Sequence, residues 1–176
     1  MEDHSLYRRI LGDQMDRLPA AVLRFHDAPR GNRGSGAFDV TRGPGLIPRL
    51  LATVVRLPRT GTGVPVELSV EANGDREKWI RRFDKHPMIT TQWQAADLLI
   101  EAAGPMRLGF QLTADETGLG FEMVRAWFLL IPLPRWLSPR VTAHETAVGD
   151  GWHAEVQFSL PVIGLLIRYA GRIQPD

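Results

Sequence analysis

The chain of 176 residues contains no cysteine, so disulfides, thiol catalysis and thiolate metal sites are excluded. It also has almost no surplus of charge. The 21 Lys and Arg residues against 20 Asp and Glu give a net charge of +1, which offers no electrostatic argument for binding nucleic acid. Lysine is scarce as well, because only Lys78 and Lys85 accompany the arginines. Such a bias is typical of a GC-rich genome, here expected to be bacterial.

Long hydrophobic runs are missing too. The longest uncharged apolar segments, "AWFLLIPLP" and "LPVIGLLI", fall well short of the ~18 residues that a membrane span needs. The N-terminal "MEDHS" is acidic, whereas a secretory signal begins with basic and then apolar residues. We therefore expect a soluble, cytoplasmic protein without a transmembrane segment. Its length favours a single domain, residues 1–176, with one core.

Residues 1–57 are predicted to be mainly helical. Apolar residues recur at helical spacing from Leu6 to Phe25, and Pro19 is expected to end one helix and begin the next. A strand is expected at "AFDVT". A further amphipathic helix is predicted from about Pro44 to Leu57. We favour a helix packed on a sheet, with a membrane-surface helix as the alternative. The residues on its apolar side are Leu46, Leu50, Leu51, Val54 and Val55, and its arginines are Arg49 and Arg56.

Residues 64–174 change to the period of two that is typical of strands, with turn signals about every ten residues. This spacing predicts antiparallel strands. A sheet of about nine strands usually curls or closes on itself. The fold class that we expect is therefore α+β: a strongly curved antiparallel sheet or barrel-like sheet with the N-terminal helices packed on it.

Three hairpins can be registered from their turns, which are Asn73-Gly74, Asp150-Gly151 and "DETG". In the expected registers, Val66 pairs with Arg81, Glu145 pairs with Val156, and Leu108 pairs with Arg125. Each hairpin then has one apolar face and one polar face. A slip of one residue would exchange the two faces.

Each apolar face carries one ionisable side chain. Arg81 lies between Trp79 and Phe83, Arg125 lies between Met123 and Trp127, and Glu145 lies among alanines and Val156. An arginine cannot escape burial by losing its proton, so it must meet a carboxylate, a carbonyl group, water or an anionic ligand. Glu145 is the first internal partner that we expect, and Glu101, at the end of "LLIE", is the second.

Two interpretations of these charges remain open. One is a buried Arg–Glu network that sets the strand register. The other is a set of polar groups in an apolar cavity, which would orient an anionic or carbonyl-bearing ligand. For the second, Glu145 and Glu101 are the candidate catalytic groups. The candidate ligand-binding residues are Arg81, Arg125, Trp79, Phe83, Phe110, Trp127, Phe158 and Tyr169.

Other chemical motifs are weak. The glycines of "RGNRGSGAF" do not form G-x-G-x-x-G, and no serine stands in a nucleophile elbow, so neither a nucleotide cofactor nor a serine hydrolase is expected. His144 and His153 fall on a polar face, and no metal site is predicted. His26 and His86 stand at expected element ends and should be solvated.

Several spaced segments resemble a known family. The segments "WIRRF", "GPMRLGFQL", "PLPRWLSP" and "SLPVIGLLIRYAGRI", with the N-terminal "LYRRILGDQMDRLPAAVLRFH" and "VTRGPGLIPRLL", resemble the domain-of-unknown-function 4166 family over almost the whole chain. The family's Trp-x-Arg-x-Phe pattern falls on Trp79, Arg81 and Phe83. Such domains occur alone or attached to Rossmann-type oxidoreductase-like domains, and this sequence has no Rossmann part. The resemblance implies no catalytic residues.

Three functions are therefore left open. The leading hypothesis is binding of a small hydrophobic molecule with a polar or anionic head. The second is a cofactor-independent cyclase or isomerase acting on a polyketide- or isoprenoid-like substrate in the same pocket. The third, suggested by the resemblance, is an interaction domain for an oxidoreductase partner. A homodimer is also left open.

Overall fold

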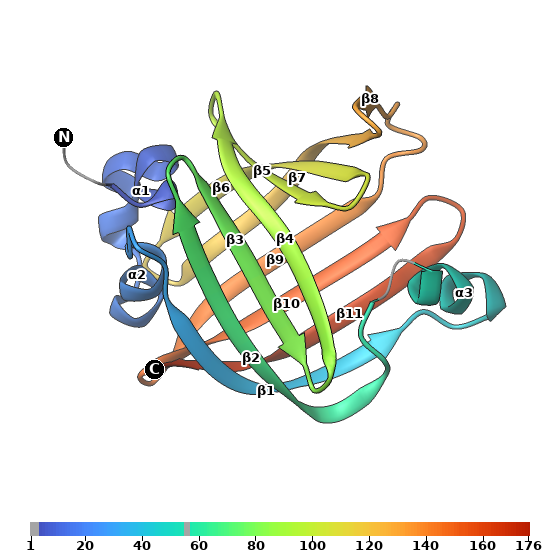
Figure 1. The fold of residues 1–176 in the computed structure, drawn as a ribbon, viewed down its shortest axis with the longest axis horizontal. Helices are drawn as coiled ribbons and strands as arrows, with labels where there is room; N and C mark the ends of the chain where they lie inside the picture. The colour runs from blue at the N-terminus through green and yellow to red at the C-terminus, as the bar shows by residue number, and fades with distance from the viewer. Residues whose placement is uncertain (1–3, 55–56) are drawn as a thin grey trace.

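The structure is a computed structural model that describes residues 4–54 and 57–176. In this part of the chain, three short α-helices and one 3-10 helix accompany eleven strands, and all the strands belong to one antiparallel sheet (Figure 1). The strands are β1 (Arg33–Arg42), β2 (Gly61–Asn73), β3 (Arg76–Phe83), β4 (His86–Ala95), β5 (Leu98–Ala103), β6 (Met106–Asp115), β7 (Gly118–Phe128), β8 (Ile131–Pro132), β9 (Arg140–Val148), β10 (Gly151–Leu160) and β11 (Gly164–Pro175).

The sheet closes into a barrel. Its strand order among the described residues is β6-β5-β4-β3-β2-β1-β11-β10-β9-β7-β8, and an additional pairing joins β6 to β7. Ten strands therefore form a closed ring, and β8 is attached to β7. Alternate side chains of every strand must point into the ring. The prediction of a barrel-like antiparallel sheet with helices is confirmed.

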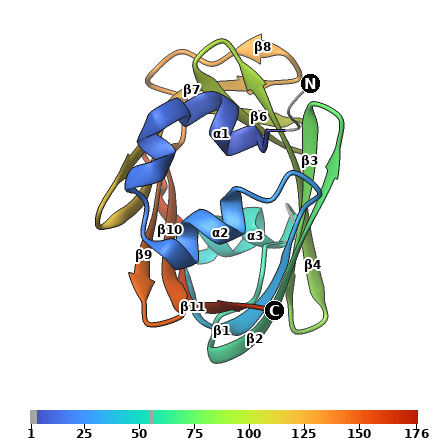
Figure 2. The same cartoon turned by 90° about the vertical axis from the view of Figure 1, so that its left-hand side faces the viewer.

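One end of the barrel is covered by the N-terminal helices (Figures 1 and 2). These are α1 (Leu6–Leu11), the 3-10 helix η1 (Gly12–Arg17) and α2 (Ala20–His26), with Pro19 as the N-cap residue of α2, as the sequence predicts. Their apolar faces are inserted into the barrel, where Met15 and Val22 are fully buried. The third helix, α3 (Leu46–Val54), lies at the opposite end.

The registers predicted for two hairpins are wrong by two residues. The two-residue turns are Gly74-Asp75 and Gly149-Asp150, so Leu68 pairs with Arg81 and Glu145 pairs with Ala154. In both turns it is the glycine that has a positive φ, which favours glycine at that position. An even shift leaves each side chain on its predicted face. Arg81 and Glu145 therefore still point inward.

The third hairpin follows the predicted register only near its turn. Phe110 pairs with Met123 as expected, but Gly109 then pairs with Arg125, because Val124 is an extra residue in β7. This β-bulge exchanges the two faces of the rest of the strand. Ala126 is buried, and Arg125 is exposed. The prediction that Arg125 and Trp127 point inward is therefore wrong.

The helix α3 packs on β11 and β1, as expected, but not through Leu46 and Leu50 of its predicted apolar side. Leu46 and Leu50 are 84% and 65% exposed, and the side of α3 that meets the barrel carries Pro48 and Ala52. Val55 and Arg56 of the predicted helix lie outside the described residues, and the side chain of Val54 is not described. No helix in the described ranges combines the length and the apolar character that a membrane crossing requires.

We predict that the two ends of the barrel differ in their contribution to stability. Met15→Ala removes a fully buried side chain and should lower the free energy of unfolding by about 2–5 kcal/mol. Leu50→Ala, in α3, should change it by no more than about 0.5 kcal/mol. Urea denaturation of both variants measures this difference. Equal losses would contradict the assignment of α1, η1 and α2 as the part of the core that closes the barrel.

Candidate functional site

A cavity of about 190 Å³ lies inside the barrel. Its lining extends from Tyr7 on α1 to Leu57, beyond α3, and most of the side chains that line it are apolar. This composition is typical of sites for small organic molecules. The polar residues in its wall are Tyr7, Arg81, Thr90, Gln92, Glu101, His144, Glu145 and Tyr169.

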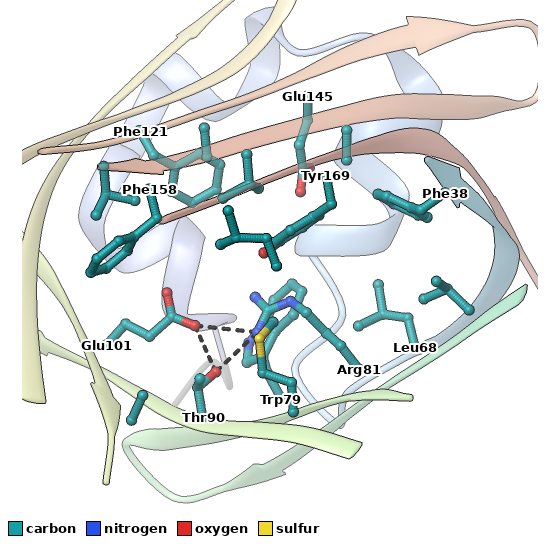
Figure 3. A pocket seen from close by; sticks show the side chains of 18 of the residues that line it. Phe38, Leu68, Trp79, Arg81, Thr90, Glu101, Phe121, Glu145, Phe158 and Tyr169 are labelled. Carbon is teal, nitrogen blue, oxygen red and sulfur yellow. Dashed lines mark hydrogen bonds and ion pairs between the residues drawn. The ribbon is translucent and has the colours of Figure 1, made fainter. Parts of the chain in front are cut away.

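Arg81 is held in the cavity by two neighbouring strands (Figure 3). Its Nη1 donates to Thr90 Oγ1 at 3.0 Å and to Glu101 Oε1 at 3.2 Å. The hydroxyl of Thr90 in turn donates to the same Glu101 oxygen at 2.6 Å. The guanidinium also lies 4.9 Å from the centroid of the Trp79 ring, which adds a cation–π contact.

Glu101 and Thr90 compensate the charge of Arg81, and they accept hydrogen bonds from only one of its three guanidinium nitrogens. Burial alone would lower the pKa of Arg81, but Glu101 and the nearby tyrosines raise it above its ordinary value, so the group stays charged. Its hydrogen bonds to described residues both leave from Nη1. The Nε and Nη2 donors remain for a carbonyl or carboxylate oxygen, in the fork geometry that suits such groups.

Glu145 has a different partner from the one expected. It does not pair with an arginine in the described structure; its Oε2 lies 2.6 Å from Nε2 of His26, at the end of α2. His26 is 4% exposed, which corrects the prediction that it is solvated. Its ring lies against Tyr7 and Trp79, and Nδ1 has no hydrogen-bond partner among the described residues.

The two tyrosines of the chain both line the cavity. The hydroxyl of Tyr7 donates to Gln92 Oε1 at 2.9 Å. Burial raises the pKa of Tyr169 to about 12, although Arg81 opposes this shift. Burial and, to a smaller extent, the nearby carboxylates raise the pKa of the Tyr7 hydroxyl well above its ordinary value. Both hydroxyls are therefore neutral donors at ordinary pH.

Most of the predicted site residues meet at this cavity. Trp79, Phe83, Phe110, Phe158 and Tyr169 line it together with Arg81, Glu101 and Glu145. Arg125 and Trp127 do not, because the bulge in β7 turns them to the outer surface. There, Trp127 covers Gly109, whose missing side chain leaves room for the indole. The partner of Arg81 is Glu101 rather than Glu145.

Sequence reasoning missed several polar residues of the interior, among them Tyr7, His26, Thr90, Gln92 and Glu77. Thr90 and Gln92 alternate with Met88 in β4, a period that places all three on one face. His26 follows Val22 by four residues, so it shares the buried face of α2. Both signals are visible in the sequence, but polar side chains are ordinarily assigned to the solvent-exposed face.

The raised pKa values of the tyrosines predict a delayed alkaline titration. In the folded protein, the ultraviolet absorbance of tyrosinate should show Tyr169 titrating near pH 12 and Tyr7 well above its ordinary range, whereas both should titrate near 10 in the denatured chain. Because the folded state holds these protons more tightly, their contribution to stability is full below pH 10 and is lost as the pH rises through the raised pKa values, about 12 for Tyr169. A native titration with its midpoint near 10 would contradict the burial of the two hydroxyls.

The comparisons with known proteins give a family but no activity. No curated protein matches the chain. A family model described as "Domain of unknown function (DUF4166)" matches residues 18–173, which include all the strands of the barrel apart from the last residues of β11. The match spans well over half of the chain, so this protein belongs to the DUF4166 family.

Proposed function

We propose that the protein binds a small hydrophobic molecule that carries a carbonyl or carboxylate group, inside the barrel. The single observation that carries this proposal is the position of Arg81, a permanent cation in an apolar cavity with Nε and Nη2 left for a ligand. In this role Trp79, Phe83, Phe110 and Phe158 would form the walls, and Tyr169 would offer a further donor.

The size of the cavity limits the ligand. Its volume of about 190 Å³ is smaller than the roughly 300–1,000 Å³ usual for drug-sized ligands. A compact ring system with one polar head fits this space better than a long acyl chain does. The pairing of Arg81 with Glu101 also favours a weak anion or a neutral carbonyl, because the carboxylate has already neutralised the arginine charge.

The first test uses 2-naphthoate, an apolar double ring with one carboxylate, as the probe. Isothermal titration calorimetry should detect binding to the wild-type protein. In Arg81→Met, which keeps most of the length of the side chain, the affinity should fall at least tenfold, because a hydrogen bond to a charged group contributes about 1.5–3 kcal/mol. Arg125→Met is the matched control, since Arg125 is exposed on the outside, and its affinity should be unchanged.

Arg81→Met leaves Glu101 without its cationic partner and could unfold the barrel. The double variant Arg81→Met/Glu101→Gln removes both charges and separates loss of folding from loss of binding. If the folded double variant binds 2-naphthoate as tightly as the wild type, Arg81 does not hold the ligand.

Proton transfer is a second candidate function, favoured by the pair of Glu145 and His26. Glu145 lines the cavity, and His26 orients it through a hydrogen bond. Such a carboxylate can remove a proton from a carbon beside a carbonyl group, while the guanidinium of Arg81 stabilises the enolate oxygen. A cofactor-independent isomerase for a polyketide- or isoprenoid-like substrate would be completed when the protonated Glu145 returns the proton to another carbon of the enolate. A cyclase would be completed when the enolate carbon attacks a second carbonyl carbon of the substrate and Glu145 protonates the alkoxide.

This second function predicts exchange of α-hydrogens. With 2-tetralone in deuterium oxide, the protein should accelerate loss of the α-proton signals in the NMR spectrum above the rate in buffer. Glu145→Gln should abolish the acceleration, and His26→Gln should reduce it. If Glu145→Gln exchanges the α-hydrogens as fast as the wild-type protein, a group other than Glu145 removes the proton. No acceleration in the wild-type protein would limit this cavity to binding.

The oxidoreductase-partner hypothesis rests on the family resemblance alone. This hypothesis stays a prediction beside the two functions proposed for the cavity.

A further inference from the structure

The apolar side chains on the surface of the protein are concentrated at one end of the barrel. Among the described residues, fourteen large apolar side chains are exposed, and eleven of them belong to three segments. These segments are α3, the chain from Phe128 to Leu137, and the turn between β10 and β11. The exposed side chains are Leu46, Ile47, Leu50, Phe128, Leu129, Leu130, Ile131, Trp136, Leu137, Val162 and Ile163.

The three segments lie at the same end of the barrel (Figure 1). Gly43, just before α3, approaches Leu165 of β11, which follows the β10–β11 turn. The β10–β11 turn and Trp136 line the same surface hollow. We call this surface, formed by α3, residues 128–137 and the β10–β11 turn, the apolar end. The opposite end is closed by α1, η1 and α2.

Three large apolar side chains of α3 face solvent, which is unusual for a surface helix. Leu46, Ile47 and Leu50 point to solvent, whereas the small side chain of Ala52 is buried. A helix that only covers a barrel would place its leucines inward. An exposed patch of this kind marks a contact with a protein or a membrane.

The charges around the apolar end are almost all positive. The sequence contains no Asp or Glu in residues 40–66, 123–144 or 156–164, which build most of this end. Arg49, Arg135 and Arg140 are exposed, and the acidic residue in the neighbouring β3–β4 turn is Asp84. This distribution is a local asymmetry, because the chain as a whole is nearly neutral.

A basic cleft adjoins α3. It has a volume of about 420 Å³, and Arg42, Arg59, Lys85 and His86 line it together with Thr53 and Leu57 of the α3 segment, without a carboxylate in the described wall. Arg42 is occupied in holding this segment, because it donates to the carbonyl oxygens of Leu57 and Pro58. Burial and then repulsion from Arg59 lower the pKa of Arg42. Arg59 and Lys85 have no ion-pair partner among the described residues.

We infer that the protein docks on anionic lipid bilayers through the apolar end. The exposed face of α3, Trp136 and Val162 would enter the interface between headgroups and acyl chains, to a depth of about 5–10 Å. Arg59 and Lys85 would meet lipid phosphates, and the exposed Arg49, Arg135 and Arg140 would add positive charge elsewhere on the apolar end. Leu57 lines both the basic cleft and the interior cavity, so a docked barrel holds its cavity next to the bilayer.

A second copy of the chain fits this surface less well. In a two-fold dimer the same patch meets itself, so the clusters around Arg59 and Lys85 would face like charges across the contact. A bilayer that contains anionic lipid supplies the opposite charge together with an apolar phase. The positive charges and the apolar side chains of this surface would then both find a complementary partner.

The test is flotation of the full chain with vesicles of phosphatidylcholine, with or without about a quarter of phosphatidylglycerol. We expect binding that requires the anionic lipid and weakens at high salt. Leu46→Ser/Leu50→Ser should lower the partition coefficient roughly a hundredfold through lost apolar burial. Arg59→Gln/Lys85→Gln should lower it by about fivefold for each charge removed.

The matched control is Val148→Ser, because Val148 is also exposed but ends β9 beside Gly151, at the end of the β9–β10 hairpin that is remote from the β10–β11 turn. It should bind vesicles like the wild type, and thermal unfolding should verify that all variants fold. Wild-type protein that does not float with anionic vesicles overturns the inference. So does a dimer in size-exclusion chromatography that Leu46→Ser/Leu50→Ser dissociates without affecting flotation. Because the vesicles carry no added ligand, this result is independent of the proposed function of the cavity.

Discussion

The pairing of β6 with β7 closes the sheet, and the interior of the protein depends on this closure. Once the ring is closed, every second side chain of ten strands has to share one enclosed volume. Side chains can just fill a barrel of eight strands, and a ring of ten is wider. The apolar faces of α1, η1 and α2 fill one end of that extra space, and the rest remains as the cavity.

The closed ring also explains the arrangement of the buried charges. Arg81 keeps its charge and points inward, so the strands beside it must supply compensation, and they do so through Thr90 and Glu101. Glu145, on the facing wall, is compensated by His26 on the helical cap. Each charge therefore has its own partner, and neither needs the other. This separation leaves donors of Arg81 and the carboxylate of Glu145 directed into one apolar space (Figure 3).

Such an arrangement is costly for a purely structural role. Well-packed apolar residues often replace a buried ion pair without loss of stability. A barrel selected only for stability would have no need of two separately compensated charges beside a cavity. The exposed leucines of α3 show the same departure from the most stable arrangement at the outer surface. The first departure supports the ligand site proposed inside the barrel, and the second supports the proposed docking of its outer surface on a bilayer.

The sequence predicts a strongly curved or barrel-like sheet and most of the cavity wall, because the period of two determines which side chains share a face. This signal tolerates register errors of two residues, so Arg81 and Glu145 are placed correctly although their predicted partners are wrong. It fails at the bulge, because one extra residue, Val124, has no periodic signature and reverses the position of Arg125. The outward orientation of the apolar face of α3 cannot be predicted from the sequence either, since an amphipathic pattern is the same whether that face meets a sheet or a bilayer.

The central claim is that Arg81 marks a ligand site, and native mass spectrometry of the protein purified from its own host tests it most directly. We expect an adduct of one small molecule on the wild-type chain. The adduct should be absent from folded Arg81→Met/Glu101→Gln and retained by Arg125→Met. A bare mass for the wild-type chain, or an adduct that persists in the double variant, would contradict the account and leave Arg81 and Glu101 as a structural ion pair.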